Sequence, residues 1–206
     1  MKATMKTLSA ILICCFISTI QMYGENIQRP ESENYVKGVE ALNEGNPEAA
    51  YTYLNAEINE HPDNGYAHCY MALICNFCND TKLALKALNS SLELIPEADT
   101  EYRSFAHYSR GVLLSNLKMW ERAEADLNEA IRLNPEDVEN YKSRAQLYFE
   151  TERYEESLDD LTRALKLDSK ADVNDLVLQL MAVAPTSEFM ERITATYQQL
   201  DQVTIH

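Results

Sequence analysis

Hydrophobic and polar positions follow one pattern along most of this chain. Between residues 31 and 171, small and apolar side chains recur at three- and four-residue spacing, which is typical of amphipathic helices. Ala123, Leu127 and Ala130 show the spacing on one predicted helix face. Short turns are expected between the helices at "NEGNP", "CNDTK", "NLKMW" and "ETERY". The pattern therefore predicts an all-α protein built of helix pairs joined by short turns.

The helix pairs repeat along the chain. A shift of 34 residues superimposes Ala145 on Gly111 and Leu161 on Leu127, and similar shifts reach the earlier pairs. Four copies are predicted at 31–64, 65–98, 104–137 and 138–171, with five extra residues, 99–103, between the second and third. Small residues recur where the two helices of a copy are expected to cross closely: Gly38, Ala72, Gly111 and Ala145. Proline follows three of the second helices, at Pro62, Pro96 and Pro135, and Ser169 stands there in the fourth.

These copies resemble the tetratricopeptide repeat, which combines a 34-residue period with small-residue, alanine and terminal proline positions. The sequence departs from that pattern at the aromatic opening position, which holds Asn34, His68, His107 and Tyr141. The resemblance implies an α-solenoid of four repeats, with first helices on a concave face and second helices on a convex face. It also implies a scaffold that binds a protein or peptide partner in the concave groove and does not catalyse a reaction.

The N-terminal end differs from the repeats. Residues 1–24 place two lysines before the apolar run "LSAILICCFISTI", which is the order of a secretory signal peptide and is short for a membrane span. We expect cleavage near Gly24, no membrane span afterwards, and export to the periplasm or cell envelope. An uncleaved signal anchor, or a lipid anchor at Cys14 or Cys15, is the alternative. Residues 25–30 form a short linker.

The C-terminal segment, residues 172–206, continues the helical pattern without the repeat motif. A stack of repeats needs a terminal unit that covers its last apolar face, so we expect capping helices here. Thr186 or Ser187 is expected to cap the last helix. The alternative is a tail that binds a partner or dimerises.

The charge of the chain limits its partners. It carries 33 acidic against 18 basic residues, with a formal net charge of −15. Such a chain repels phosphates, so no nucleic acid is expected as a partner. The acids are expected to form a solvated surface, although residues 31–64, with eight acids and one lysine, could also attract a basic partner.

Cysteines offer a candidate chemistry. Beyond the predicted signal there are three, Cys69, Cys75 and Cys78, an odd number that implies no disulfide framework. The C-x-x-C of Cys75 and Cys78 aligns with plain hydrophobes of the next copy, so we expect packing; a thiol-disulfide accessory role is the alternative. We likewise expect His68 and His107 to pack, and no metal, cofactor or catalytic site.

Two charge pairs recur at a spacing of 16 residues. Arg110 with Asp126 and Arg144 with Asp160 would lie on facing helices of one repeat, which favours structural ion pairs. The alternative is that the arginines bind an anion in the groove.

A stripe on the first helices is the predicted partner-binding groove. Its aromatic side chains combine apolar area with polar groups, and its amides could bond a peptide backbone. A purely structural homo-oligomer is the remaining alternative for the whole chain. The predicted groove residues are Tyr35, Tyr66, Tyr70, Asn76, Phe77, Phe105, Tyr108, Asn116, Lys142, Gln146 and Phe149.

Overall fold

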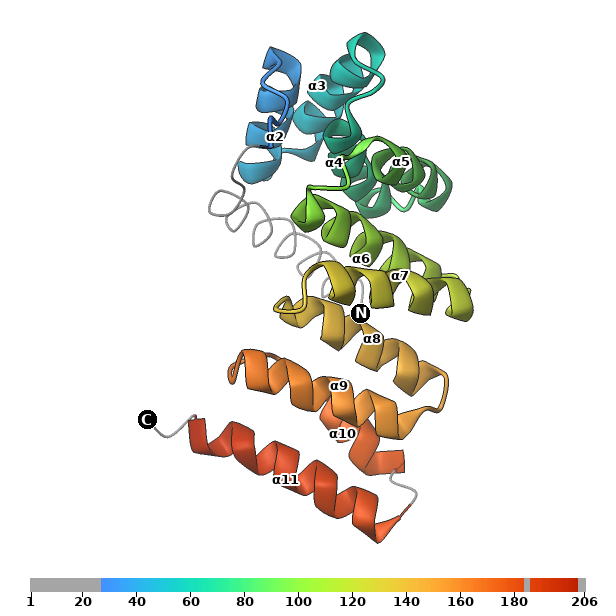
Figure 1. Ribbon diagram of the computed structural model, residues 1–206, viewed down its shortest axis with the longest axis vertical. Coiled ribbons are helices and arrows are strands. Elements are labelled where there is room, and N and C mark those ends of the chain that lie inside the picture. Colours follow the sequence, from blue (N-terminus) through green and yellow to red (C-terminus); the bar gives the residue numbers. More distant parts are fainter. Residues whose placement is uncertain (1–26, 184–185, 204–206) are drawn as a thin grey trace. The chain divides into compact units, whose positions relative to one another are not determined.

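The structure, a computed structural model, describes residues 27–183 and 186–203 (Figure 1). Within these ranges the chain forms helices and no strand, which confirms the all-α class. The predicted signal peptide lies outside the described residues. The helices are α2 (Glu33–Asn43), α3 (Pro47–Glu60), α4 (Gly65–Phe77), α5 (Thr81–Leu94), α6 (Thr100–Asn116), α7 (Trp120–Leu133), α8 (Val138–Glu150), α9 (Tyr154–Leu167), α10 (Asn174–Val183) and α11 (Ser187–Val203).

The chain divides into two compact units, Met1–Leu113 and Leu114–His206, called here the N-terminal and C-terminal units. In the N-terminal unit α2 packs against α3, α3 against α4, and α4 against α5. In the C-terminal unit α7 packs against α8, and α8 against α9. Each predicted repeat therefore contains two helices, and within each unit the helices of these pairs pack on their neighbours in the sequence.

The turns within the repeats share one backbone feature. A residue with positive φ occurs at Gly45 (72°), Asn79 (62°), Lys118 (59°) and Glu152 (62°). These four residues follow one another at the same intervals as the repeats. Gly45 adopts this conformation without steric cost, because glycine has no Cβ atom. The repeat therefore imposes the same turn on Asn79, which tolerates this conformation, and on Lys118 and Glu152, whose side chains disfavour it.

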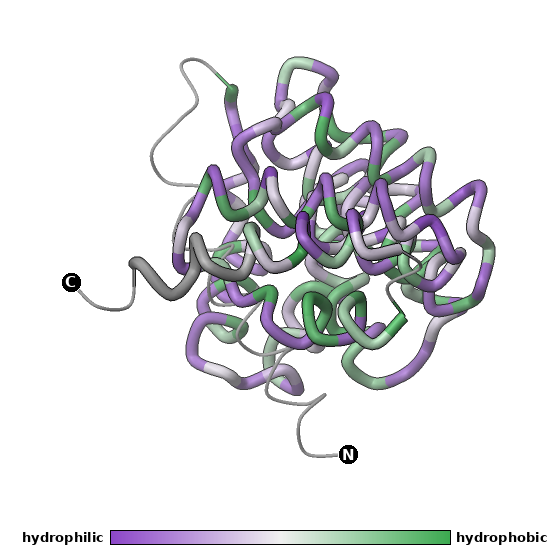
Figure 2. Tube along the Cα trace, turned by 90° about the horizontal axis from the view of Figure 1, so that it is seen from below, coloured by the Kyte–Doolittle hydropathy of each residue, from purple (hydrophilic) through white to green (hydrophobic). Residues whose placement is uncertain are grey.

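The core of each unit is built from the same repeat positions. Hydrophobic and hydrophilic residues alternate along the helical coils in Figure 2, as amphipathic helices require. A small residue near the start of each second helix is fully buried, and the leucine four residues later is at most 2% exposed. The small residues are Ala50, Ala84, Ala123 and Ser157, and the leucines are Leu54, Leu88, Leu127 and Leu161.

Gly38 lies where α2 and α3 approach each other closely. A Cβ atom built on this glycine would lie 2.7 Å from Leu54 Cγ and 2.8 Å from Leu54 Cδ2. Leu54 is fully buried, so its side chain has little room to move away. Glycine is thus needed at this crossing, whereas its place in the repeat predicts only a small residue.

The five extra residues belong to a helix rather than to a connection between helices. α6 begins at Thr100 and has 17 residues, whereas α4 and α8 have 13 each. Asp99 precedes its first turn, and Asp99 Oδ1 accepts a 3.3 Å hydrogen bond from the backbone N–H of Tyr102. Residues 99–103 therefore extend the first helix of the third repeat at its N-terminus.

The last two helices cover the end of the repeats. α9 packs against both α10 and α11, and Phe189 and Ile193 of α11 join its buried leucines in one hydrophobic cluster. Thr186 is the cap of α11, since its Oγ1 accepts a 3.1 Å hydrogen bond from Phe189 N. Helices α10 and α11 therefore complete the C-terminal unit.

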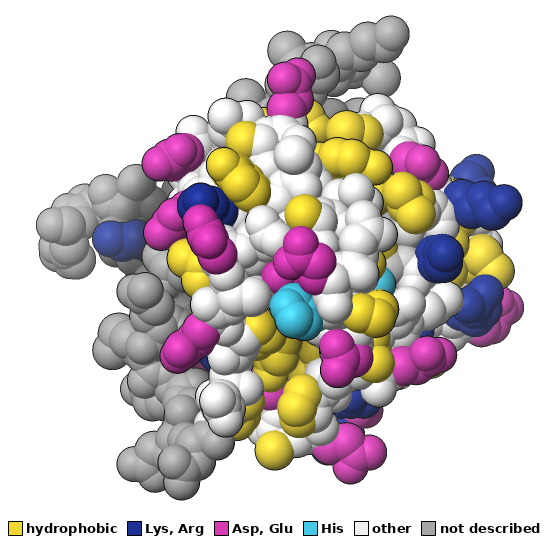
Figure 3. All heavy atoms as spheres, turned by 90° about the horizontal axis from the view of Figure 1, so that it is seen from above, with side chains coloured by type: hydrophobic (Ala, Val, Ile, Leu, Met, Phe, Trp, Pro, Cys, Tyr) yellow, Lys and Arg dark blue, Asp and Glu magenta, His cyan; other side chains and the backbone are white. Residues whose placement is uncertain are grey.

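The surface is acidic without a single acidic patch in the view of Figure 3. There, acidic side chains are spread over the face, with hydrophobic side chains between them, and several lysines and arginines gather at one edge.

Among the described helices, none is long and apolar enough to cross a membrane.

Candidate functional site

The predicted groove residues of the N-terminal unit fall into two groups. Tyr35, Tyr66, Tyr70 and Phe105 are buried, at 9% exposure or less. Tyr108 is half-buried and stacks on Phe105, with ring centroids 6.3 Å apart, whereas Asn76 and Phe77 are exposed at the end of α4. Buried side chains have no free surface to offer a partner. The structure thus corrects the expected groove floor, because four of its aromatic side chains pack inside the unit.

The predicted groove residues of the C-terminal unit are at least partly accessible. Asn116 is exposed, and Lys142, Gln146 and Phe149 are half-buried. Lys142 Nζ lies 2.7 Å from Glu139 Oε1 on its own helix. The Gln146 amide donates a 3.0 Å hydrogen bond to Glu150 Oε1, and Phe149 packs against Tyr154 at 5.7 Å. These side chains are held by local contacts while keeping part of their surface.

A cluster of tyrosines occupies the first helices of the N-terminal unit. The Tyr70 and Tyr102 hydroxyls lie 2.8 Å apart, and the Tyr66 and Tyr102 rings meet edge to face at 4.8 Å. Tyr35 of α2 lies 6.1 Å from Tyr70, between ring centroids. Burial raises the pKa of all four phenols, so they stay neutral hydrogen-bonding groups. Three successive first helices are joined by this cluster.

Arg29 lies against the tyrosine cluster, although it precedes α2 by only a few residues. Its guanidinium carbon is 4.6 Å from the centroid of the Tyr102 ring. Its Nε is 3.4 Å from Asp99 Oδ2, and its Nη2 is 3.1 Å from Glu101 Oε2. One aromatic face and two carboxylates therefore hold one guanidinium, a combination suited to arginine.

The electrostatics of this cluster favour the charged form of the arginine. Burial by itself would lower the pKa of Arg29, but attraction and hydrogen bonding to Asp99 outweigh it and raise that pKa. Burial also raises the pKa of the Glu101 carboxyl above its ordinary value, even though Arg29 opposes that shift. Sequence reasoning missed Arg29, Asp99, Glu101 and Tyr102. Asp99, Glu101 and Tyr102 lie in the five-residue extension. The sequence signal for them is that this extension interrupts the 34-residue repeat.

The two predicted ion pairs have different outcomes. Arg144 binds Asp160 through two contacts, Nε to Oδ2 at 2.7 Å and Nη2 to Oδ1 at 2.8 Å. Arg110 and Asp126 belong to different units, so that pair stays a prediction. Arg110 Nη1 donates a 2.8 Å hydrogen bond to Asn89 Oδ1.

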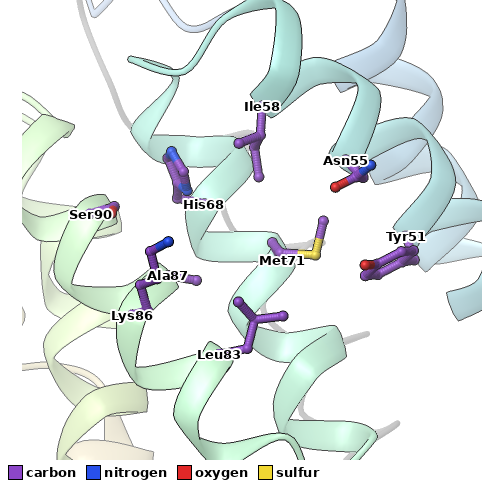
Figure 4. Close-up of a pocket in the computed structure, with 9 residues that line it drawn as sticks. All are labelled: Tyr51, Asn55, Ile58, His68, Met71, Leu83, Lys86, Ala87 and Ser90. Carbon is purple, nitrogen blue, oxygen red and sulfur yellow. The ribbon is translucent and has the colours of Figure 1, made fainter.

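A cleft of about 220 Å³ opens between α3 and α5, with α4 at its floor (Figure 4). Tyr51, at 44% exposure, and Leu83, at 37%, lie at its sides. Met71 is buried at its floor. Its sides come from the second helices α3 and α5 and its floor from the first helix α4, and none of the predicted groove residues lines it. Its lining residues are Tyr51, Asn55, Ile58, His68, Met71, Leu83, Lys86, Ala87 and Ser90.

The cysteines of the described residues are free thiols in unlike surroundings. Cys69 and Cys75 are buried, and Cys78 is exposed at the end of α4, so the packing prediction is wrong for Cys78. Burial raises the pKa of Cys69 to about 12 and that of Cys75 to about 11. A thiolate is the reactive form, so Cys75 lacks the environment of a redox cysteine.

His68 makes a backbone contact near the start of α4. His68 is half-buried, and its Nε2 lies 3.0 Å from the carbonyl oxygen of Pro62. Residues 27–183 and 186–203 contain no group of three His, Cys, Asp or Glu side chains that could hold a metal ion.

Two comparisons by sequence concern the repeats. Models of the family described as tetratricopeptide repeat match residues 104–137 and 139–170. The chain is 31% identical over 87 residues to "Lipoprotein NlpI homolog" of Haemophilus influenzae, covering 42% of this chain and 28% of that protein. It is 24% identical over 143 residues to human "Tetratricopeptide repeat protein 6", covering 69% of this chain and 26% of that protein. The chain thus spans about a quarter of the length of these relatives.

Solved structures show the same fold. The structure titled "MamA 41-end from Desulfovibrio magneticus RS-1" has a TM-score of 0.66 at 18% identity, covering 83% of this chain and 93% of that one. A second, titled "Crystal structure of YrrB: a TPR protein with an unusual peptide-binding site", has a TM-score of 0.60 at 20% identity and covers 71% and 73%. At these identities the likeness establishes the fold alone.

Proposed function

We propose that this chain, whose repeats match the tetratricopeptide-repeat family models, is a scaffold for protein interactions that binds a peptide segment of its partner on the first helices of its repeats. The binding would require no cofactor and no catalysed reaction. The observation that carries the proposal is Arg29, which reaches Asp99 from a non-helical segment 70 residues earlier in the chain. The first-helix face of the N-terminal unit thus already accommodates an irregular stretch of polypeptide.

The residues that could contact a partner are those of the predicted groove that keep exposed surface. In the N-terminal unit they are Asn76, Phe77 and Tyr108, and Tyr108 offers an aromatic face beside a polar hydroxyl. In the C-terminal unit they are Asn116, Lys142, Gln146 and Phe149. The buried tyrosines support these surfaces from within.

A pair of tyrosine variants tests this proposal. The tagged full chain should retain a specific protein from an envelope extract, and Tyr108→Ala should release it. Tyr51→Ala is the matched control, because Tyr51 is an exposed tyrosine on the second helix α3. Equal retention by the wild type and Tyr108→Ala would reject binding at the first helices. Sedimentation of the purified chain tests the homo-oligomer alternative, which requires a concentration-dependent increase in mass.

We also propose that the chain is exported. The two lysines and the apolar run at the N-terminus support export, and one relative is named a lipoprotein. Fractionation of the expressing cells and the intact mass of the product test this. A mature chain that begins near Glu25 supports cleavage, acylation at Cys14 or Cys15 supports a lipid anchor, and an unmodified chain in the cytoplasm contradicts export.

A further inference from the structure

The extension of α6 builds a receptor for a guanidinium group. Asp99, Glu101 and Tyr102 all come from residues 99–103, the segment that breaks the repeat period. Together they surround the Arg29 side chain with two carboxylates and an aromatic face. The carboxylates of such a site select a positive charge and the direction of its hydrogen bonds, and the aromatic face selects a planar cation.

The receptor side is held in place by contacts that do not involve Arg29. Asp99 has a side chain only 1% exposed, and its Oδ2 accepts a 3.0 Å hydrogen bond from the Tyr66 hydroxyl. Its Oδ1 accepts from Tyr102 N at the start of α6, where the helix dipole also favours a negative charge. The Tyr102 hydroxyl meets that of Tyr70. The receptor is therefore preorganised, which lowers the cost of binding a guanidinium.

The segment that supplies Arg29 leaves polar atoms unsatisfied where it meets the rest of the unit. Ser32, the residue before α2, makes no side-chain capping bond. Its Oγ and Glu57 Oε2 are buried without a hydrogen-bond partner within the described residues. Both residues line a cleft of about 300 Å³ together with Pro30. Displacing this segment would expose these buried polar atoms to water. Their hydration would offset part of the free energy that the displacement costs.

We propose that this cluster is an arginine-binding site for a basic peptide of the partner, and that the chain's own Arg29 occupies it until the partner displaces it. The inference rests on the proposed function, since it specifies a partner for the same first-helix face. Charge complementarity supports it: residues 31–64 carry eight acids and one lysine, so a basic segment is attracted to this unit. Because Arg29 is tethered close by, its effective concentration is high and an incoming arginine must compete with it.

A labelled peptide tests the site directly. The probe is fluorescein-labelled NIQRPES, the sequence of residues 26–32, and its binding to the purified full chain is followed by fluorescence anisotropy. Arg29→Ala, which leaves the receptor empty, should bind the probe about tenfold more tightly than the wild type, since competition within the chain is lost. Replacing the probe's arginine by citrulline should weaken binding by about tenfold, because citrulline keeps the shape but not the charge.

Two further variants separate the site from general charge effects. Glu101→Gln, made in the Arg29→Ala chain, should weaken binding of the probe, whereas Glu97→Gln, which removes an exposed acid just before the extension, should leave it unchanged. Circular dichroism verifies that each variant is folded. Arg29→Gln serves as a second empty-site variant.

The outcomes distinguish this inference from the proposed function. Failure of both empty-site variants to bind the probe, or equal binding of the arginine and citrulline probes, overturns the arginine site but leaves partner binding at Tyr108 untouched. A change of oligomeric state in Arg29→Ala also overturns it, because the cluster would then hold a second copy of the chain. Arginine-dependent binding of the probe with no effect of Tyr108→Ala on the partner supports the site and contradicts the wider groove.

Discussion

Replacing Asp160 by alanine should lower the free energy of unfolding of the C-terminal unit by about 2–3 kcal/mol. Removing one partner of a buried ion pair commonly costs about 3–5 kcal/mol, because the other charge is left without its counterion. Three features reduce the cost here. The Arg144 side chain is 20% exposed to water, its Nη1 keeps a 2.6 Å hydrogen bond to Asn128 Oδ1, and its guanidinium carbon lies 5.6 Å from the centroid of the Tyr148 ring.

The pKa of Asp160 supports the lower magnitude. Burial raises that pKa despite the attraction of Arg144, so desolvation offsets part of what the pair contributes. Because its pKa is raised in the folded state, protonation of Asp160 adds to the free energy of unfolding at acidic pH. This contribution is lost as the pH rises through the raised pKa. The loss on substitution is therefore below that of an ideally compensated pair.

The assay is urea unfolding followed by the fluorescence of Trp120, which begins α7 in the C-terminal unit. Asp159→Ala is the matched control: its side chain is 70% exposed, its 2.7 Å contact is to Arg192, and its loss should cost about 0.5 kcal/mol or less. A double-mutant cycle with Arg144→Met isolates the pair. Equal losses for Asp159→Ala and Asp160→Ala, or a coupling energy below about 0.5 kcal/mol, would refute the reasoning.

Three other substitutions or reactions test separate parts of the structure. Gly38→Ala should destabilise the chain by about 1–2 kcal/mol in urea unfolding, because its Cβ would collide with the buried Leu54; a neutral effect would contradict the close crossing. Thr186→Ala should cost about 1 kcal/mol and speed hydrogen exchange at the start of α11, whereas unchanged exchange would reject its capping role. Alkylation mapped by mass spectrometry should modify Cys78 first, with the Cys75 rate rising about tenfold per pH unit below its pKa of about 11; rapid modification of Cys75 at pH 7 would revive the thiol-disulfide alternative.

Burial limits how much of the site the sequence could predict. The repeat register correctly places Tyr35, Tyr66 and Tyr70 on first helices, but register does not say whether a neighbouring helix covers them. Tyr70 is 2% exposed, because the first helices on either side supply Tyr35 and Tyr102 as packing partners. An aromatic stripe in the sequence is therefore equally compatible with a groove and with a core.

The sequence by itself determined the helices, their turns and the repeat register. These depend on contacts between residues close in the chain, such as apolar spacing within a helix and the turns at Gly45 and its equivalents, and repetition makes the signal cumulative. Only the tertiary structure decided that Arg29 meets Asp99 and Glu101, about 70 residues away. Such a meeting depends on how successive helices stack, and no local pattern of side chains records it.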